Sequence, residues 1–299
     1  MSITSKSPAA VLRAALQVAR QALPAYSHRC SRKTYTQHQL FACLVLKNFL
    51  KTDYRGVVAQ LQDCSSLQEL LELDQVPHYT TLQKAAHRLL KSAPARKLLD
   101  ATVREQLGRR QRVPISAIDS TGMECTAASG YFVRRRANVD GPWKTLVYHR
   151  YPKLGVICDV ESHFILAFDT RRGPKPDVAE FKQLLDDALT RVRLTTIVAD
   201  AGYDSESNHC HAREERQVRT VIPAKHGRPT NKPARGRHRR LMQVRFNVDA
   251  YRQRAQVETV MSMIKRRQGS HVRAVTYHSQ CRDLRLMALT HNVMILLFY

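Results

Sequence analysis

The chain has 299 residues, 43% of them hydrophobic, which is enough to bury the core of one large or two modest domains and excludes a disordered tail. Lysine and arginine number 49 against 25 acidic residues, so the formal charge is 49 − 25 = +24, which favours a polyanionic partner. No apolar run approaches the roughly 18 residues of a membrane-spanning helix and no secretory signal pattern opens the sequence, so we expect a soluble, intracellular protein.

Residues 1–110 are predicted to form an all-helical domain, because apolar residues recur at three- and four-residue steps. The expected helices cover residues 9–20, 36–51, 54–62, 66–73 and 81–90. A turn with hydroxyl caps at Pro77–Thr81 precedes a helix that carries Lys84, His87 and Arg88. This pattern suits a helix-turn-helix element in a DNA-binding or oligomerisation domain, and a helical bundle with a solvated basic face is the alternative.

Residues 111–299 are predicted to form an α/β domain. Strands are expected at 113–118, 146–151, 154–160, 163–168, 195–199 and 217–222, with a hairpin turn at Glu161–Ser162. Asp177 is expected to cap a helix that runs to residue 190, and Asp204 or Ser205 a shorter helix. This order of elements predicts a mixed sheet flanked by helices.

Two aspartates each follow a buried-looking strand. Asp119 follows the strand at 113–118, and Asp200 follows the strand at 195–199. Open α/β sheets build ligand sites at the carboxyl ends of strands, so we expect both side chains at one edge of the sheet. With a third carboxylate, Glu258, from a packed helix, they could bracket two divalent cations for an in-line displacement at phosphorus.

Glu258 lies on a helix that we expect Asp249 to cap. On a continuous helix Arg254, Glu258 and Lys265 fall at about 300°, 340° and 320° from Tyr251, so all four share one face. The neighbouring arc is apolar and consists of Ala250, Val257, Val260, Met261 and Ile264. An aromatic ring, two cations and a carboxylate on one stripe suit a metal ligand flanked by phosphate-binding groups. An exposed ion pair between Glu258 and Arg254 is the alternative.

A strongly basic insertion separates this helix from the preceding strand, at about residues 223–248. We predict DNA contacts for Lys225, Arg228, Arg235, Arg237, Arg239 and Arg240. Such charge density indicates a clamp on the DNA backbone, and a solvated loop is the alternative.

The seven cysteines are scattered and never form Cys-x-x-Cys, so neither a disulfide framework nor a zinc ribbon is expected. His209-Cys210-His211 is predicted to be an ordinary polar segment, because neighbours in sequence rarely all point at one ion.

The spacing of Tyr251, Arg254, Glu258 and Lys265 resembles the tyrosine-arginine-glutamate-lysine signature of one branch of bacterial insertion-sequence DDE transposases. The segments Ile118–Thr121 and Asp200–Ser205 resemble those around the first and second aspartates of that family. The resemblance covers roughly residues 113–298, and implies an RNase H-like catalytic core.

The resemblance also implies roles for these residues. Asp119 would bridge two Mg²⁺ or Mn²⁺ ions, Asp200 would bind one of them and Glu258 the other. Arg254 and Lys265 would hold phosphates, and Tyr251 would pack against a terminal nucleotide. The partners would be double-stranded DNA, as element ends and target, and a second copy of the chain in a homodimer. The protein would be cytoplasmic and nucleoid-associated.

The sequence departs from the family between the second aspartate and the glutamate. The gap is 258 − 200 = 58 positions, without the large β-rich insertion of many members, and the only tryptophan, Trp143, lies elsewhere. A hairpin intermediate handled by base flipping is therefore not expected. A non-catalytic repressor or architectural protein descended from a transposase, and a purely hydrolytic nuclease, are the alternative functions.

Overall fold

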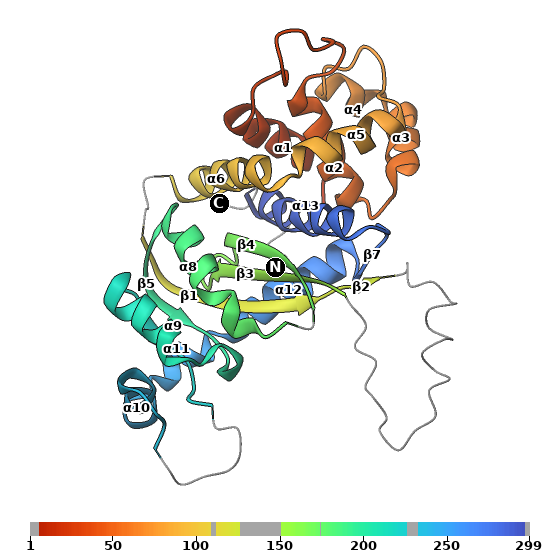
Figure 1. The fold of residues 1–299 in the computed structure, drawn as a ribbon. Coiled ribbons are helices and arrows are strands. Elements are labelled where there is room, and N and C mark those ends of the chain that lie inside the picture. The colour runs from red at the N-terminus through yellow and green to blue at the C-terminus, as the bar shows by residue number, and fades with distance from the viewer. Residues whose placement is uncertain (1–5, 109–111, 126–150, 174, 226–232, 297–299) are drawn as a thin grey trace, which may run out of the picture.

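The computed structural model describes residues 6–108, 112–125, 151–173, 175–225 and 233–296 (Figure 1). The strand predicted at 146–151 and Trp143 lie outside the described residues. Within the described ranges, no helix is long and apolar enough to cross a membrane.

Six helices form the first part of the chain. They are α1 (Pro8–Ala22), α2 (Gln37–Phe49), α3 (Tyr54–Asp63), α4 (Ser65–Leu70), α5 (Tyr79–Leu89) and α6 (Ser92–Leu107). The first five confirm the predicted helices. The sixth was not predicted, because its buried face includes Ala95, Ala101 and Thr102, which weaken the apolar pattern. Helix α5 begins inside the predicted turn, and the side chain of His78, not a hydroxyl group, caps it.

A five-stranded mixed sheet forms the second part. Its strands are β1 (Arg112–Gly122), β3 (Pro152–Asp159), β4 (Ile165–Arg172), β5 (Arg193–Val198) and β6 (Arg219–Val221), in the order β4-β3-β1-β5-β6. The β1–β3 and β3–β4 pairs are antiparallel, whereas β1–β5 and β5–β6 are parallel. The predicted mixed sheet is confirmed. A small parallel pair, β2 (Glu124–Cys125) with β7 (His271–Val272), was not predicted.

The remaining helices surround this sheet. They are α8 (Phe181–Leu189), α9 (Glu206–Cys210), α10 (Arg237–Val244), α11 (Val248–Arg252), α12 (Ala255–Gln268) and α13 (Tyr277–Ile295), with a 3₁₀ turn at Asp177–Ala179, another at Ala201–Tyr203 and a π-turn at His211–Glu215. The prediction that Asp177 caps a helix through residue 190 was wrong in detail. The α-helix begins only at Phe181, because Asp177 opens a separate 3₁₀ turn and its carboxylate bonds to Ser120 instead.

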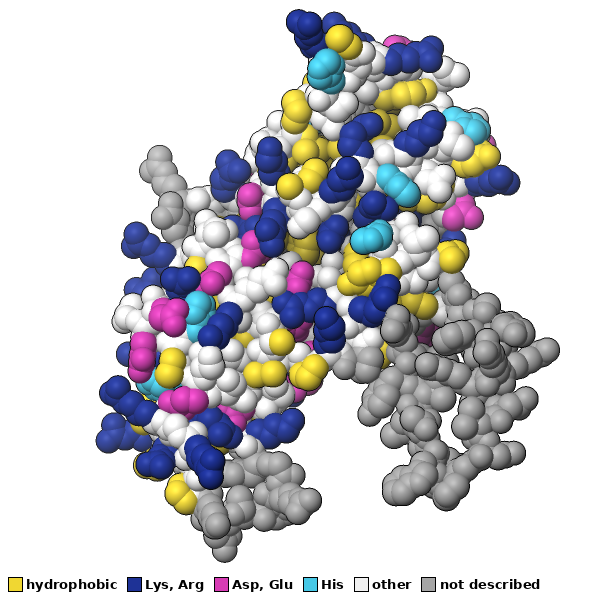
Figure 2. Space-filling model, in the orientation of Figure 1, with side chains coloured by type: hydrophobic (Ala, Val, Ile, Leu, Met, Phe, Trp, Pro, Cys, Tyr) yellow, Lys and Arg dark blue, Asp and Glu magenta, His cyan; other side chains and the backbone are white. Residues whose placement is uncertain are grey.

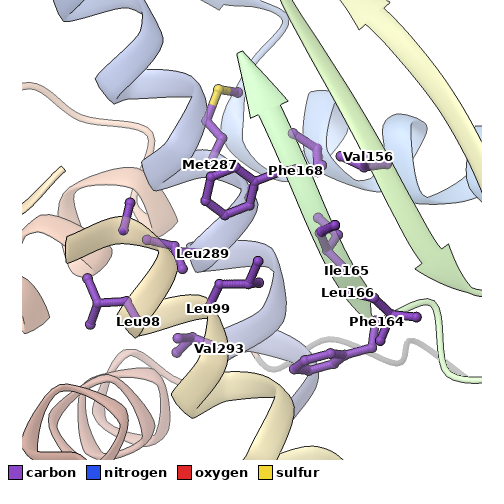
Figure 3. Close-up of a cluster of buried hydrophobic side chains, with 14 of the residues drawn as sticks. Leu98, Leu99, Val156, Phe164, Ile165, Leu166, Phe168, Met287, Leu289 and Val293 are labelled. Carbon is purple, nitrogen blue, oxygen red and sulfur yellow. The ribbon is translucent and has the colours of Figure 1, made fainter. Parts of the chain in front are cut away.

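Helix α13 joins the helical region to the sheet. Figure 3 shows Leu98 and Leu99 of α6 and Leu289 and Val293 of α13 in one cluster with side chains of β4, with Leu98 on the side of α6 that is farther from β4. The buried Asn292 of α13 bonds to both backbone polar atoms of Ile165 and to Thr102 of α6. Because β4 is an edge strand of the described sheet, Asn292 supplies polar partners on the side of β4 where the described residues place no further strand. One continuous hydrophobic core therefore includes both parts.

The two faces of the sheet have different coverings. On β3, Val156 lies in the cluster of Figure 3 with Phe168 and Met287 of α13. The preceding residue, Gly155, faces the opposite way, where an added Cβ would lie 2.9 Å from the Glu180 carboxylate beside α8. Successive residues along one strand point to opposite faces of the sheet, so α13 and α8 cover opposite faces. Helix α12 also packs against α13, β1 and β3.

Candidate active site

The first two predicted carboxylates lie at the same level on neighbouring parallel strands. Ala117 of β1 pairs with Val198 of β5, and Asp119 and Asp200 each come two residues later. Strand β1 continues to Gly122, so Asp119 does not end it as predicted. Asp119 pairs across β3 with Val156, which places its side chain on the face that α12 and α13 cover. The geometry therefore puts both aspartates at the carboxyl end of the parallel pair.

Asp119 lies in an environment that disfavours its charge. Burial and, to a smaller extent, the nearby negative charge of Asp200 raise the pKa of Asp119 to about 6. The N–H group of Ser120, which donates to Asp119 Oδ1 at 2.7 Å, and the positive charge of Arg254 act in the opposite direction. Asp200 accepts a hydrogen bond from the N–H of Gly202 at 2.8 Å and so caps the following 3₁₀ turn. Two mutually repelling carboxylates in a partly buried position are typical of a site that binds cations.

Glu258 lies in the first turn of α12 and pairs with Arg254. The Arg254 Nη2 atom is 2.7 Å from Glu258 Oε1, with side-chain exposures of 24% and 54%. The ion pair named as the alternative for Glu258 is therefore present. The positive charge of Arg254 also lowers the pKa of Asp119, so the guanidinium lies near that carboxylate as well as near Glu258. The structure brings Asp119, Asp200, Arg254 and Glu258 to one region.

The prediction of one continuous helix through these residues was wrong. Helix α11 ends at Arg252 and α12 begins at Ala255, with Arg254 in the break. Across the break the N–H groups of Arg254 and Val257 bond to carbonyls three residues earlier, which tightens the chain into a 3₁₀-like turn. Asn247, not Asp249, caps α11. All five residues of the predicted apolar arc are buried, namely Ala250, Val257, Val260, Met261 and Ile264.

Because of the break, Tyr251 and Lys265 lie on different helices. Tyr251 is half-buried on α11, with its ring centroid 5.1 Å from that of Phe246. Lys265 is half-buried in the last turn of α12. Tyr251, Arg254, Glu258 and Lys265 therefore follow one another along a bent segment, whose second helix, α12, packs against β1 and β3.

A second polar network, which was not predicted, lies on the other face of the sheet. Ser120 follows Asp119 and donates to Asp177 at 2.7 Å, and Lys153 pairs with the same carboxylate. Glu180 accepts a hydrogen bond from Tyr203 at 2.9 Å, and burial raises the pKa of Glu180 to about 7. The spacing of two carboxylates ahead of a helix was the available signal. It was missed because Asp177 was interpreted only as a helix cap.

The basic insertion contains α10, and its arginines differ in their surroundings. Arg237 is exposed, and Lys225 and Arg235 are exposed as well. Arg240 is exposed and donates to the carbonyl of Ala234 at 3.1 Å. Arg239 instead pairs at 2.8 Å with Asp204, whose side chain is fully enclosed. Arg239 thus holds α10 against the core, and Arg228 lies outside the described residues.

Comparison with known families identifies the second part of the chain. Residues 111–293, more than half of the sequence, match the family described as the transposase DDE domain. The chain belongs to this transposase family. The matched segment includes the whole sheet as well as Asp119, Asp200 and Glu258.

Two further comparisons add little to this assignment. The transposase is similar to the piggyBac transposase of a cryo-EM synaptic complex with hairpin DNA, with a TM-score of 0.46 and 10% identity, over 98% of this chain and 72% of the other. Likeness at this level carries no argument about the site. No curated protein matches the sequence.

The donor set of this transposase fits hard divalent cations. Carboxylate oxygens are the ligands that Mg²⁺ and Mn²⁺ prefer, and Asp119 and Asp200 are partly buried without a cationic side chain at bonding distance in the described structure. The three carboxylates do not yet converge, since Asp119, Asp200 and Glu258 are not among the described residues whose ligand atoms all lie within 4.8 Å of one another. Glu258 would have to leave Arg254 to complete a three-carboxylate site.

Proposed function

We propose that this transposase cuts DNA at the ends of its mobile element and joins the freed 3′-hydroxyl to target DNA, with two Mg²⁺ or Mn²⁺ ions held by Asp119, Asp200 and Glu258. The observation that carries the proposal is the position of Asp119 and Asp200 at one level of neighbouring parallel strands. The Arg254–Glu258 pair beside them supplies the third carboxylate and a cation. When bound, the ions would activate the attacking oxygen and stabilise the leaving oxygen at phosphorus.

The side chains around the carboxylates have separate roles in this proposal. Arg254 neutralises Glu258 while the site is open, and its guanidinium becomes available to a DNA phosphate once Glu258 turns toward the aspartates. Lys265, in the last turn of α12, supplies a point charge to the DNA backbone. Tyr251 packs on Phe246, and this contact fixes the Tyr251 ring for contact with a terminal nucleotide.

Double-stranded DNA is the partner that the charge distribution favours. Figure 2 shows lysine and arginine side chains over the helical region with few acidic ones between them. Lys84, His87 and Arg88 are exposed on α5, and we assign end recognition to this helix. Lys225, Arg228, Arg235, Arg237 and Arg240 would contact the backbone near the cut. A homodimer in the bacterial nucleoid would bring two element ends together.

Cleavage of supercoiled DNA that carries candidate element ends tests the proposal. We expect nicking with Mg²⁺, none with EDTA, and none with Asp119→Asn in either condition. Asp249→Asn is the matched control, because it removes the same charge from an exposed position on α11 and should leave nicking intact. Metal-independent nicking, or nicking by Asp119→Asn, would contradict the assignment.

The products separate joining from hydrolysis. A labelled 3′-hydroxyl donor end should become covalently attached to target DNA. Cleavage without joining would instead identify a hydrolytic nuclease, and tight salt-sensitive binding without cleavage would identify a non-catalytic DNA-binding protein.

A further inference from the structure

Three potential metal ligands meet where the basic insertion packs on the core, away from the carboxylates of the candidate active site. Glu206 and Cys210 are four residues apart on α9, so both lie on one face of that helix. His238 comes from α10, in the basic insertion. One ligand atom from each of these side chains lies within 4.8 Å of the other two, and among the described residues no other group of three or more does so.

His238 has a free ring nitrogen in this cluster. The residue is 7% exposed, and its Nε2 atom lies 2.8 Å from Glu214 Oε1. A carboxylate accepts hydrogen bonds, so Nε2 carries the proton and Nδ1 keeps its lone pair. Nδ1 is buried and has no hydrogen-bond partner, which is costly for a buried acceptor. A histidine that donates one N–H to a carboxylate and leaves the other nitrogen bare is arranged as metal-bound histidines usually are.

Glu206 holds the start of α10 beside this nitrogen. Its two carboxylate oxygens accept the N–H groups of His238 at 2.9 Å and of Arg239 at 3.1 Å. Gly236, with φ of +104°, allows this approach, because an added Cβ would lie 2.1 Å from a Glu206 oxygen. Each carboxylate oxygen has a second lone pair, so these bonds leave Glu206 able to bind a cation.

We propose that Glu206, Cys210 and His238 bind one Zn²⁺ ion, with water as the fourth ligand. A thiolate and an imidazole favour zinc over Mg²⁺, which distinguishes this site from the all-oxygen site at Asp119. Ligands of one tetrahedral zinc are about 3.3–3.8 Å apart, and small rotations of the half-exposed Glu206 and Cys210 side chains close that gap. His209 and His211 take no part, because they bond to Thr220 and Asp186 respectively.

The ion would act as a clasp between α9 and α10. The polar contacts that attach the basic helix include those to Glu206, to Glu214 and in the Asp204–Arg239 pair, and Met242 of the same helix is buried. Zinc would fix α10, and with it the exposed Arg237 and Arg240, relative to the sheet. This inference rests on the local ligand geometry and does not depend on the DNA chemistry proposed above.

Titration of the full chain with Co²⁺ tests the site, because a cysteine ligand gives cobalt a thiolate charge-transfer band that carboxylates cannot give. We expect the band to saturate at one equivalent and to disappear when Zn²⁺ is added. Cys210→Ser should abolish it, whereas Cys30→Ser, at an exposed cysteine outside the cluster, should retain it. Absence of the band in the wild type, or its survival in Cys210→Ser, overturns the proposal.

A second pair of variants tests His238 without changing a ligand. Glu214→Gln removes the carboxylate that orients the ring, and should weaken Co²⁺ binding about 10- to 100-fold. Glu215→Gln is the matched control, because this adjacent exposed carboxylate bonds to His211 instead. Zn²⁺ should also slow tryptic cleavage after Arg237 and Arg240 in the wild type and not in Cys210→Ser. Equal Co²⁺ affinities of the two glutamine variants, or equal cleavage with and without Zn²⁺, would contradict the clasp.

Discussion

Two aspartates four positions apart in the chain show how differently this transposase treats its carboxylates. Asp200 lies with Asp119 at the end of the parallel strands, where the two repel each other and burial raises the pKa of Asp119 to about 6. The Asp204 side chain is fully buried, and its carboxylate bonds to His209, to Arg239 and to the backbone N–H of Lys225. Desolvation acts to raise the pKa of Asp204, but these three hydrogen bonds outweigh it and lower that pKa.

The difference separates carboxylates that hold the fold from those that remain available for a ligand. Asp204 has its charge neutralised within the protein, so its removal should affect folding first. Asp119 and Asp200 each accept a backbone N–H, but among the described residues neither has a cationic side chain at ion-pair distance, and a partly buried charge of this kind is maintained where it serves a function. The variants below test this distinction, from the largest expected effect to the smallest.

Glu258→Gln should have the largest effect, on catalysis. In the proposed function Glu258 is a metal ligand, so loss of its charge should remove several kcal/mol of transition-state stabilisation, and about 4 kcal/mol corresponds to roughly a thousandfold slower cleavage. The midpoint of urea unfolding should stay close to that of the wild type, because Glu258 is exposed by 54%. Glu161→Gln, at an exposed position in the β3–β4 turn, should leave cleavage unchanged. A Glu258→Gln protein that cleaves at the wild-type rate would place the third carboxylate elsewhere.

Asp204→Asn should instead reduce stability. It leaves the Arg239 guanidinium, 20% exposed, without its carboxylate partner, and breaking such a buried pair costs about 3–5 kcal/mol. Urea unfolding monitored by circular dichroism measures the loss. Asp249→Asn breaks an exposed pair with Arg252 and should cost less than about 1 kcal/mol. Equal losses in the two variants would show that burial of Asp204 does not strengthen its pairing.

The sequence predicted the order of elements well, because apolar periodicity reports which face of a helix or strand is buried. Helix α6 was not predicted, because the polar Thr102 occupies a buried position. Its burial depends on hydrogen bonds to the carbonyl of Leu99 and to the distant Asn292, and a pattern of apolar residues does not show such bonds. The break between α11 and α12 also left no trace, since neither Gln253 nor Arg254 is a helix breaker.

The candidate site was only partly predictable for a related reason. Strand ends indicated Asp119 and Asp200, since the carboxyl ends of parallel strands meet at one edge. The network of Asp177, Glu180 and Tyr203 depends on contacts between residues 20 or more positions apart, which local patterns do not encode. The approach of His238 to Cys210 depends in the same way on how α10 folds back onto α9.

Glu180 allows the comparison of carboxylates to be tested through pH, because its side chain is buried and nearby cations only partly neutralise its charge. Its side chain is 3% exposed, and burial raises the pKa of Glu180 from 4.5 to about 7. A raised folded-state pKa gives stability that is complete below about pH 4.5 and is lost as the pH rises through about 7. The wild type should therefore lose up to about 3 kcal/mol over this window relative to Glu180→Gln.

Urea unfolding at pH 4.5 and pH 8 measures that difference. The side-chain amide introduced by Glu180→Gln keeps an oxygen that can accept the Tyr203 hydroxyl, so the variant tests charge without removing the hydrogen bond. Glu124→Gln changes an exposed glutamate and should follow the wild-type pH profile. A Glu180→Gln profile parallel to that of the wild type would show that Glu180 is not the group responsible.

The smallest effect is expected for the Arg254–Glu258 pair, which belongs to the candidate active site but makes a short ion pair of 2.7 Å. A pair four residues apart with one half-exposed partner should couple by only about 0.3–0.5 kcal/mol in a double-mutant cycle with alanine, and salt should reduce that value. Arg252 and Asp249, paired at 3.3 Å on α11, provide the reference cycle. A weak coupling means that Glu258 can leave Arg254 at little cost and reach the aspartates. A coupling above about 1.5 kcal/mol would show that this glutamate, like Asp204, is held for the fold.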